Sequence, residues 1–328
     1  MRIHFSRGDL ARTRLAEGAD VAWEVINSLH ALQAAYGGSI LRAWRKATGP
    51  DLAAADLGRR VRDRLFPVAP NASYFPDLLT PPEGALGLGE ALETVVSAPR
   101  RRLRQEFGAL RGSPGAGPWL ADLAAGRTAA LRELAATLSE YHRVSVEPHW
   151  ESITTSVAAD LAFRRRALRE HGIAALLATF RPMMRWEDPV LHLPIHPSGR
   201  DVHLRGRGLV LIPSYFCRRH PLTIFSAELP QVVVYPVELP LRAAVPSSVG
   251  ALERLLGETR AAVLLAVRAE RTTGELSRDL GVAPATISHH TGILREAGLI
   301  HSRRTANTML HTLSPLGAAL LNRHPWQT

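Results

Sequence analysis

A short run of polar side chains near the C-terminus has the residue types to bind a nucleic acid. Thr286, Ser288 and His289 flank Ile287, and Leu294 follows Ile287 two helical turns later. On a helix, the hydroxyls and the imidazole would lie off the stripe that the two apolar residues define. Short polar side chains on an exposed helix can hydrogen bond to base edges or phosphate oxygens in a major groove. The segment therefore predicts a DNA-binding helix.

Two predicted helices position this polar run. Thr272 and Glu275 have the spacing of a capping box, which begins the first helix. Gly281 follows its last apolar residue, where a left-handed C-terminal cap is favourable. Pro284 suits the first position of the second helix, because its missing N–H would have no partner there. The pattern predicts a helix-turn-helix whose second helix covers residues 284–297.

A predicted hairpin follows the second helix. Residues 301–313 have the pattern strand, turn, strand, and Arg303 and Arg304 come just before the turn. Asn307 is the best candidate for a left-handed conformation in that turn, which has no glycine. Arginines near a hairpin tip can contact phosphates or a minor groove beside the recognition helix. Together these elements have the layout of a winged helix-turn-helix.

Two short motifs carry a family resemblance. They are Ser288-His289-His290 and Leu294-Arg295-Glu296-Ala297-Gly298-Leu299. With them, the segment from 252 to 321 resembles an ArsR-type winged-helix repressor domain. The whole chain also resembles actinobacterial regulators that place such a domain behind a long N-terminal region of unassigned role, with residues 211–217 as the matching stretch.

The resemblance implies a homodimer on double-stranded DNA, with a pseudo-palindromic operator. In such proteins the helices that flank the reading head form the dimer contact. The second helix, here 284–297, would enter the groove, with Ser288 and His289 as base contacts. The candidate DNA-binding residues are Thr272, Pro284, Ala285, Thr286, Ser288, His289, His290, Arg295, Arg303, Arg304 and Asn307.

Three positions depart from the family pattern. Ala283 stands where many relatives have a serine cap, which weakens the helix start by about 1 kcal/mol. Thr291 and Gly292 stand where relatives usually carry Leu and a basic residue. The wing turn, 305–307, lacks the usual glycine.

Composition supports a polyanionic partner and an intracellular location. The 328 residues are enough for two domains and carry a formal net charge of +10. Cys217 is the single cysteine, so no intramolecular disulfide can form. The N-terminus is too polar for a secretion signal, and the apolar runs are too short to span a membrane. We therefore expect a cytoplasmic protein without membrane contact.

The N-terminal region is expected to be mostly helical with a small antiparallel sheet. Helices are predicted over 131–142 and 152–180. Short β-type runs occupy residues around 188–236, and Arg205-Gly206-Arg207-Gly208 has the composition of a hairpin connection. The fold class predicted for the chain is thus an α+β N-terminal domain, residues 1–245, and a winged helix-turn-helix, residues 249–328.

Several side chains of the β-rich segment have the chemistry to form a binding or sensing site. Its histidines are His192, His196, His203 and His220. No carboxylate or cysteine stands beside them at clear ligand spacing, so neither a metal site nor a cofactor is predicted. Cys217 is a candidate thiol sensor, although a lone cysteine is more often inert core. The aromatic residues Tyr215, Phe216 and Phe225 suggest a pocket for a small-molecule effector.

The function predicted from the sequence is DNA-binding transcription regulation, as a repressor in preference to an activator. The alternative is a winged-helix module that binds another protein and has no specific DNA target. An enzyme is not expected, because the chain has no nucleophile elbow, phosphate-binding glycine loop or paired-carboxylate signature.

Overall fold

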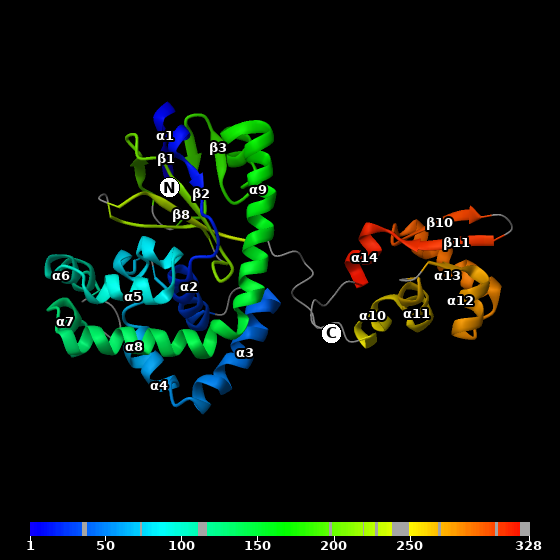
Figure 1. Cartoon of the computed structure of the whole chain (residues 1–328), viewed down its shortest axis with the longest axis horizontal. Coiled ribbons are helices and arrows are strands. Elements are labelled where there is room, and N and C mark those ends of the chain that lie inside the picture. Colours follow the sequence, from blue (N-terminus) through cyan, green and yellow to red (C-terminus); the bar gives the residue numbers. More distant parts are fainter. Residues whose placement is uncertain are drawn as a thin grey trace. The chain divides into compact units, whose positions relative to one another are not determined.

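The computed structural model describes most of the chain and divides it into two compact units, Met1–Leu239 and Pro240–Thr328 (Figure 1). The described residues are 1–34, 38–72, 74–110, 117–196, 199–218, 220–226, 229–237, 249–267, 270–305 and 308–321. No helix among them is both long enough and apolar enough to cross a membrane.

The N-terminal unit begins with two short strands and continues with a long helical stretch before its remaining strands. Its helices are α1 (Arg7–Arg12), α2 (Val21–Gln33), α3 (Gly38–Ala54), α4 (Gly58–Arg60), η1 (Val61–Leu65), η2 (Asp77–Leu79), η3 (Pro82–Ala85), α5 (Leu88–Val96), α6 (Arg100–Gly108), α7 (Pro118–Ala124), α8 (Thr128–Ser145), η4 (Glu147–His149) and α9 (Trp150–Ala178). Its strands are β1 (Arg2–His4), β2 (Arg14–Leu15), β3 (Arg185–Glu187), β4 (Val190–His192), β5 (Asp201–His203), β6 (Val210–Ser214), β7 (Leu222–Thr223) and β8 (Val232–Pro236).

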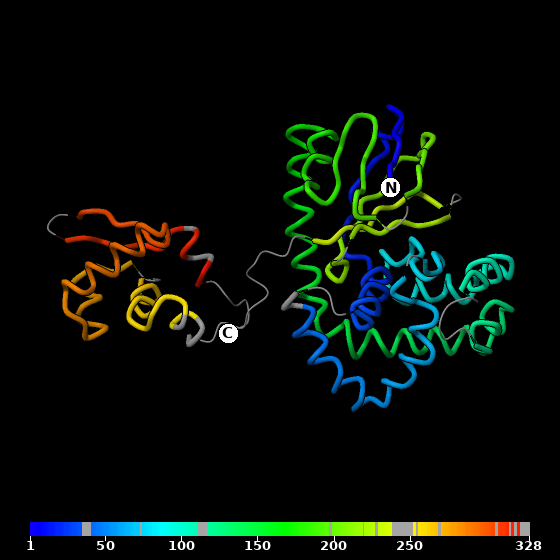
Figure 2. Tube along the Cα trace, turned by 180° about the vertical axis from the view of Figure 1, so that it is seen from behind, coloured from blue at the N-terminus to red at the C-terminus, as the bar shows by residue number. Residues whose placement is uncertain are grey.

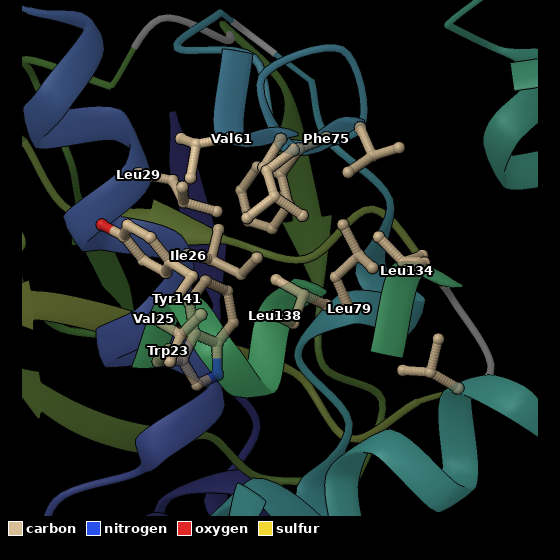
Figure 3. Packing of buried hydrophobic residues seen from close by; sticks show 14 of the residues in the cluster. Trp23, Val25, Ile26, Leu29, Val61, Phe75, Leu79, Leu134, Leu138 and Tyr141 are labelled. Atoms are coloured by element: carbon tan, nitrogen blue, oxygen red, sulfur yellow. The ribbon is translucent and has the colours of Figure 1, made fainter. Parts of the chain in front are cut away.

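Helix α2 lies at the centre of the larger hydrophobic core. Residues 21–31 of this helix are all buried, and Trp23, Ile26 and Leu29 pack among side chains from η1, η2 and α8 (Figure 3). Asp20 caps the helix, because its Oδ1 accepts hydrogen bonds from the backbone N–H groups of Ala22 and Trp23. A helix that is buried on all sides depends for its stability on the elements packed around it.

The predicted single antiparallel sheet was wrong. The unit contains two four-stranded sheets of mixed direction, in the orders β3-β4-β1-β5 and β2-β6-β8-β7. Strand β1 pairs in parallel with β5, and β6 pairs in parallel with both β2 and β8. The physical reason is that β1 and β2, from the start of the chain, supply strands to sheets whose other members lie beyond residue 184.

The connection over residues 205–208 is not a hairpin either. It joins β5 and β6, which belong to different sheets, and it packs against α1. The N–H of Gly208 donates to Asp9 Oδ1 over 3.0 Å. Gly208 has a φ of 75°, and a Cβ there would collide with the backbone of Arg12. Gly208 therefore serves close packing against α1 and not a two-residue hairpin turn.

Two long helices frame the N-terminal unit. Helix α8 confirms the predicted helix over 131–142 and extends it at both ends. Helix α9 lies beside the sheets and contacts β3 and β6 (Figure 1). It is interrupted at Gly172, whose φ of 80° is not helical. Its side chains Val157, Leu161, Leu176 and Leu177 join a second core with Ile3, Leu191 and Leu211.

The C-terminal unit is a winged helix, as the sequence predicted. Its elements are α10 (Val249–Leu256), α11 (Glu258–Ala266), β9 (Arg271–Thr272), α12 (Thr273–Leu280), α13 (Pro284–Glu296), β10 (Ile300–Thr305), β11 (Thr308–Leu313) and α14 (Pro315–Leu321). The three strands form an antiparallel sheet in the order β10-β11-β9. Figure 2 shows the unit from behind, with α12 and α13 in orange and the hairpin in red. The mainly helical fold class predicted for the whole chain is confirmed, apart from the sheet direction.

Candidate nucleic-acid interface

Helix α12 begins at the predicted capping box. The N–H of Glu275 donates to Thr272 Oγ1, and the N–H of Thr272 donates to Glu275 Oε2 over 2.7 Å. The hydrogen bond from the Thr272 N–H, followed by that from the Thr272 hydroxyl, holds the pKa of the Glu275 carboxyl below its usual range. The Thr272 hydroxyl also donates to the same carboxylate, over 2.9 Å. Thr272, a candidate DNA contact, thus already has its side chain in the cap.

The turn between α12 and α13 is held by backbone conformation and one side chain. Gly281 has a φ of 65°, which is the left-handed cap expected from the sequence. The Ser277 hydroxyl donates to the carbonyl of Val282 over 2.7 Å. Pro284 is the first residue of α13, and Ala283 before it offers no side-chain cap. Because residue 283 is an alanine and not the serine of many relatives, α13 begins without a capping hydroxyl.

One face of α13 is anchored in the C-terminal core. Ile287 and Leu294 are buried with Leu264 and Leu276. Thr291 is also buried, and its hydroxyl donates to the carbonyl of Ser288 over 3.1 Å. A threonine can therefore replace the leucine of relatives at this position, because its polar group has a partner within the helix.

The opposite face of α13 is exposed and carries most of the candidate residues. The exposed ones are Pro284, Ala285, Thr286, Ser288, His289 and Arg295. His290 is half-buried, and its Nδ1 has no hydrogen-bond partner among the residues that the structure describes. Burial, with the nearby His289 and Arg260, lowers the pKa of His290. His289 is thus the better placed of the two imidazoles to contact a ligand in solution.

The wing presents its two arginines on different faces. Arg303 pairs with Leu310 and Arg304 with Met309 in the β10–β11 ladder, and both arginines are exposed. Because side chains alternate along a strand, only Arg304 shares a face with Ser302 and His311. Among the described residues, neither arginine takes part in an ion pair. Asn307 lies outside the described residues.

A buried histidine at the base of the wing was not singled out from the sequence. His311 Nε2 lies 3.0 Å from Thr273 Oγ1, and its Nδ1 lies 2.8 Å from Ser302 Oγ. Burial, and the charge of Arg295, lower the pKa of His311. The imidazole therefore ties the first turn of α12 to both strands of the hairpin. The register of the hairpin places His311 opposite Ser302, but no local signal in the sequence shows that this imidazole is buried.

The net charge is denser in the C-terminal unit. Residues 240–328 hold ten arginines and six carboxylates, a formal net charge of +4. Residues 1–239 hold +6 over more than twice the length. An exposed polar helix and two arginines without ion pairs in a basic unit can together bind phosphates and base edges.

The other candidate side chains are dispersed. His192 Nε2 lies 3.2 Å from Glu187, His203 stacks on His4, and the rings of His196 and His220 are 6.0 Å apart. Within the described parts of the chain, no three histidine, cysteine, aspartate or glutamate side chains are grouped as metal ligands would be.

The structure separates two aromatic residues of the suggested effector pocket and buries the candidate thiol sensor. Phe216 is buried against Trp44, whereas Phe225 packs on Tyr74, so the aromatic residues do not share one pocket. Cys217 is buried, and burial raises the pKa of its thiol to about 12. Such a thiol has little thiolate to react with an oxidant.

Two family models match separate segments of the chain. Residues 255–303 match a helix-turn-helix domain family, and residues 100–241 match a family of unknown function, DUF5937. The first match covers α11, α12, α13 and the start of the wing. Together with the relatives below, it confirms the ArsR-type helix-turn-helix predicted at the C-terminus, behind a region of unassigned role.

The chain is similar to two proteins named biofilm growth-associated repressor, from the Temecula1 and 9a5c strains of Xylella fastidiosa. Each is 34% identical over 55 residues, which is 17% of this chain and 48% of the relative. The chain thus spans about half the length of the curated relatives it matches. No solved structure matches the chain.

Proposed function

We propose that the chain is a DNA-binding transcriptional regulator that acts as a repressor. The observation that carries the proposal is the exposed polar face of α13, with Thr286, Ser288 and His289 opposite the buried Ile287 and Leu294. A helix so anchored presents short donors and acceptors at a fixed spacing, which recognition in a major groove requires. The name of the similar Xylella proteins favours repression over activation.

We further propose that the protein binds as a homodimer to a pseudo-palindromic operator. Leu255 on α10 and Leu316 on α14 are large apolar side chains, yet they are 70% and 57% exposed in the single chain. Both are on helices outside the helix-turn-helix pair, which are the ones that form the dimer contact in ArsR-type proteins. In a symmetric dimer that uses these helices, the partner would cover both leucines and remove their apolar surface from water.

The first test is selection from a library of random duplexes with the purified full chain. An enriched inverted repeat is expected, with half-sites about one helical turn apart. Ser288→Ala with His289→Ala should weaken binding to that repeat about 5- to 150-fold, if the two contacts together contribute about 1–3 kcal/mol. Ser139→Ala with His171→Ala, the same exchanges in the N-terminal unit, is the matched control and should change nothing.

The salt dependence tests the wing. Each phosphate contact adds about 0.9 to the slope of log affinity against log salt concentration. Arg303→Ala and Arg304→Ala, made separately, show which face of the hairpin contacts the backbone, and Arg132→Ala on α8 is the control. If neither variant changes the slope, the wing is not part of the interface.

Failure of the selection would favour the other class of function. No enriched sequence, weak binding to all duplexes and no effect of the α13 variant would contradict DNA recognition. The winged helix would then be a module that binds another protein.

A further inference from the structure

A cleft of about 390 Å³ opens in the N-terminal unit where the larger core meets the surface. It lies between the start of α2, η3 and the adjacent strands β2, β6 and β8. Its volume is within the range of about 300–1,000 Å³ that is typical of small-molecule sites.

The walls of the cleft are largely apolar. Val210 and Val232 are opposite each other in the β6–β8 ladder, and both remain half-buried at the cleft. Trp23 from α2 forms a further wall. Leu86, at the rim, is 78% exposed. An apolar molecule in the cleft would cover surface that the fold leaves in contact with water.

One of the carboxylates that line the cleft is buried. Asp20 is 5% exposed, and both of its hydrogen bonds to the N-terminus of α2 are accepted by Oδ1. In the described part of the chain, Oδ2 accepts no hydrogen bond and no cation pairs with Asp20. Burial raises the pKa of this carboxyl to about 6, so it is mostly ionised above pH 7. A buried carboxylate of this kind favours a positive partner.

The position of Asp20 is fixed by its neighbours. A Cβ at Gly84 would collide with Asp20 Oδ1 and with Ala22 Cβ, so η3 packs directly on the capped end of α2. On the other side, Arg165 of α9 donates to the carbonyls of Ala16 and Glu17, each over 3.0 Å. Neighbouring elements therefore hold two parts of the lining in place, the start of α2 and residues 16–17.

The remaining charges lie at the mouth. Arg14 and Glu17 line the cleft but are exposed, and they have opposite signs. Water screens both of them more than it screens Asp20. The buried carboxylate of Asp20 therefore decides which ligand charge the cleft favours.

We propose that this cleft binds a small apolar amine, with its hydrocarbon part against Val210 and Val232 and its ammonium group on Asp20 Oδ2. The amine can bind in the cleft whether or not the chain binds DNA. A role as the effector of a regulator would rest on the function proposed above.

The test uses three probes that share one hydrocarbon cage: 1-adamantylamine, 1-adamantanol and 1-adamantanecarboxylate. Calorimetric titration of the full chain at pH 7.5 should show one site per chain for the amine. We expect the amine to bind at least tenfold more tightly than the alcohol, and the carboxylate to bind most weakly.

Two variants assign the site. Asp20→Asn removes the charge but keeps a side chain that caps a helix about equally well, so α2 should remain stable. It should reduce amine affinity to that of the alcohol and leave the alcohol unchanged. Ala85→Phe, at an exposed lining position, should weaken the amine and the alcohol alike. Asp51→Asn on α3 is the control.

Three results would overturn the proposal: no binding of any probe, tightest binding of the carboxylate, or unchanged amine affinity in Asp20→Asn. If Asp20→Asn does not fold, the probe order and Ala85→Phe still decide, because both use a chain with Asp20 intact. Titration needs no DNA, so its failure is separate from failure of the duplex selection.

Discussion

The uncapped start of α13 predicts a gain in stability from one added hydroxyl, in Ala283→Ser. Ala283 has φ −56° and ψ 141°, outside the helical region, as an N-cap residue must be. The equivalent Thr272 has φ −81° and ψ 158° and caps α12 with its hydroxyl. A serine at 283 can therefore place Oγ near the first amides of α13 with little change of the backbone.

The size of the gain follows from how many amides remain without partners. The N–H groups of Thr286 and Ile287 already donate to the carbonyl of Ala283, over 2.9 and 3.0 Å. Pro284 has no N–H. Only the N–H of Ala285 has no partner among the described residues. Caps contribute about 0.5–2 kcal/mol, and one free amide places this site in the lower half, about 0.5–1 kcal/mol.

Scanning calorimetry of the full chain measures the effect. In a unit of this size, about 0.5–1 kcal/mol corresponds to a rise of about 2–8 °C in Tm. The transition of the C-terminal unit is identified with Leu294→Ala, which removes a buried side chain at a cost of about 2–5 kcal/mol. Ala262→Ser, the same exchange inside α11, should instead lower that Tm, because serine is a weaker helix former by about 0.5 kcal/mol. An unchanged or lower Tm in Ala283→Ser would refute the reasoning.

Three further outcomes are expected. Gly84→Ala should destabilise the N-terminal unit by about 1–3 kcal/mol in denaturant titration, because the added Cβ has no space. Gly89→Ala, where a Cβ would meet no atom within 4 Å, is the control and should not destabilise the unit. Equal effects of the two changes would contradict the packing at η3. Because the pKa of His311 is lowered, the folded state binds fewer protons than the unfolded state when the pH is low. The stability of the C-terminal unit should therefore fall as the pH drops below the ordinary histidine pKa of about 6.5. His311→Gln should make this decline shallower without removing it, since His290 is shifted in the same direction; an unaltered pH profile would argue against the burial of His311. Cys217, with its thiol pKa raised to about 12, should react with iodoacetamide at pH 8 only on unfolding, and rapid labelling of the native chain in mass spectrometry would show that the thiol is accessible.

The helix-turn-helix could be predicted because its signals act over a few residues. The capping box joins residues 272 and 275, Gly281 ends α12 and Pro284 begins α13. Each of these is a backbone requirement that a particular residue type satisfies locally. The exposed face of α13 followed from periodicity alone, once Ile287 and Leu294 were assigned to the core.

The sheets of the N-terminal unit could not be predicted in the same way. Strands β1 and β2 are three and two residues long, too short for an alternating pattern to stand out. Their partners, β4, β5 and β6, lie more than 180 residues away in the sequence. Strand direction depends on these distant pairings. The local runs around 188–236 therefore indicated several strands, but neither β1 and β2 nor the order of the sheets.

The candidate small-molecule site shows a similar limit. Aromatic side chains at 215, 216 and 225 suggested a pocket, but an apolar side chain is as suitable for the core, and Phe216 lies there. The cleft at Asp20 combines residues from β2, α2, η3, β6 and β8. The sequence can identify an aspartate as a helix cap, but it does not show whether one carboxylate oxygen is left without a hydrogen bond.

The place of β1 in the middle of its sheet has a consequence for synthesis on the ribosome. Strand β1 is made before β4 and β5, which flank it and follow more than 180 residues later. At about 5–20 residues per second, the nascent chain carries β1 for about 10–40 s before either partner exists. During that time its backbone groups and the apolar Ile3 are free to pair elsewhere. Translation speed between β2 and β4 would therefore influence how much of the newly made protein reaches this fold.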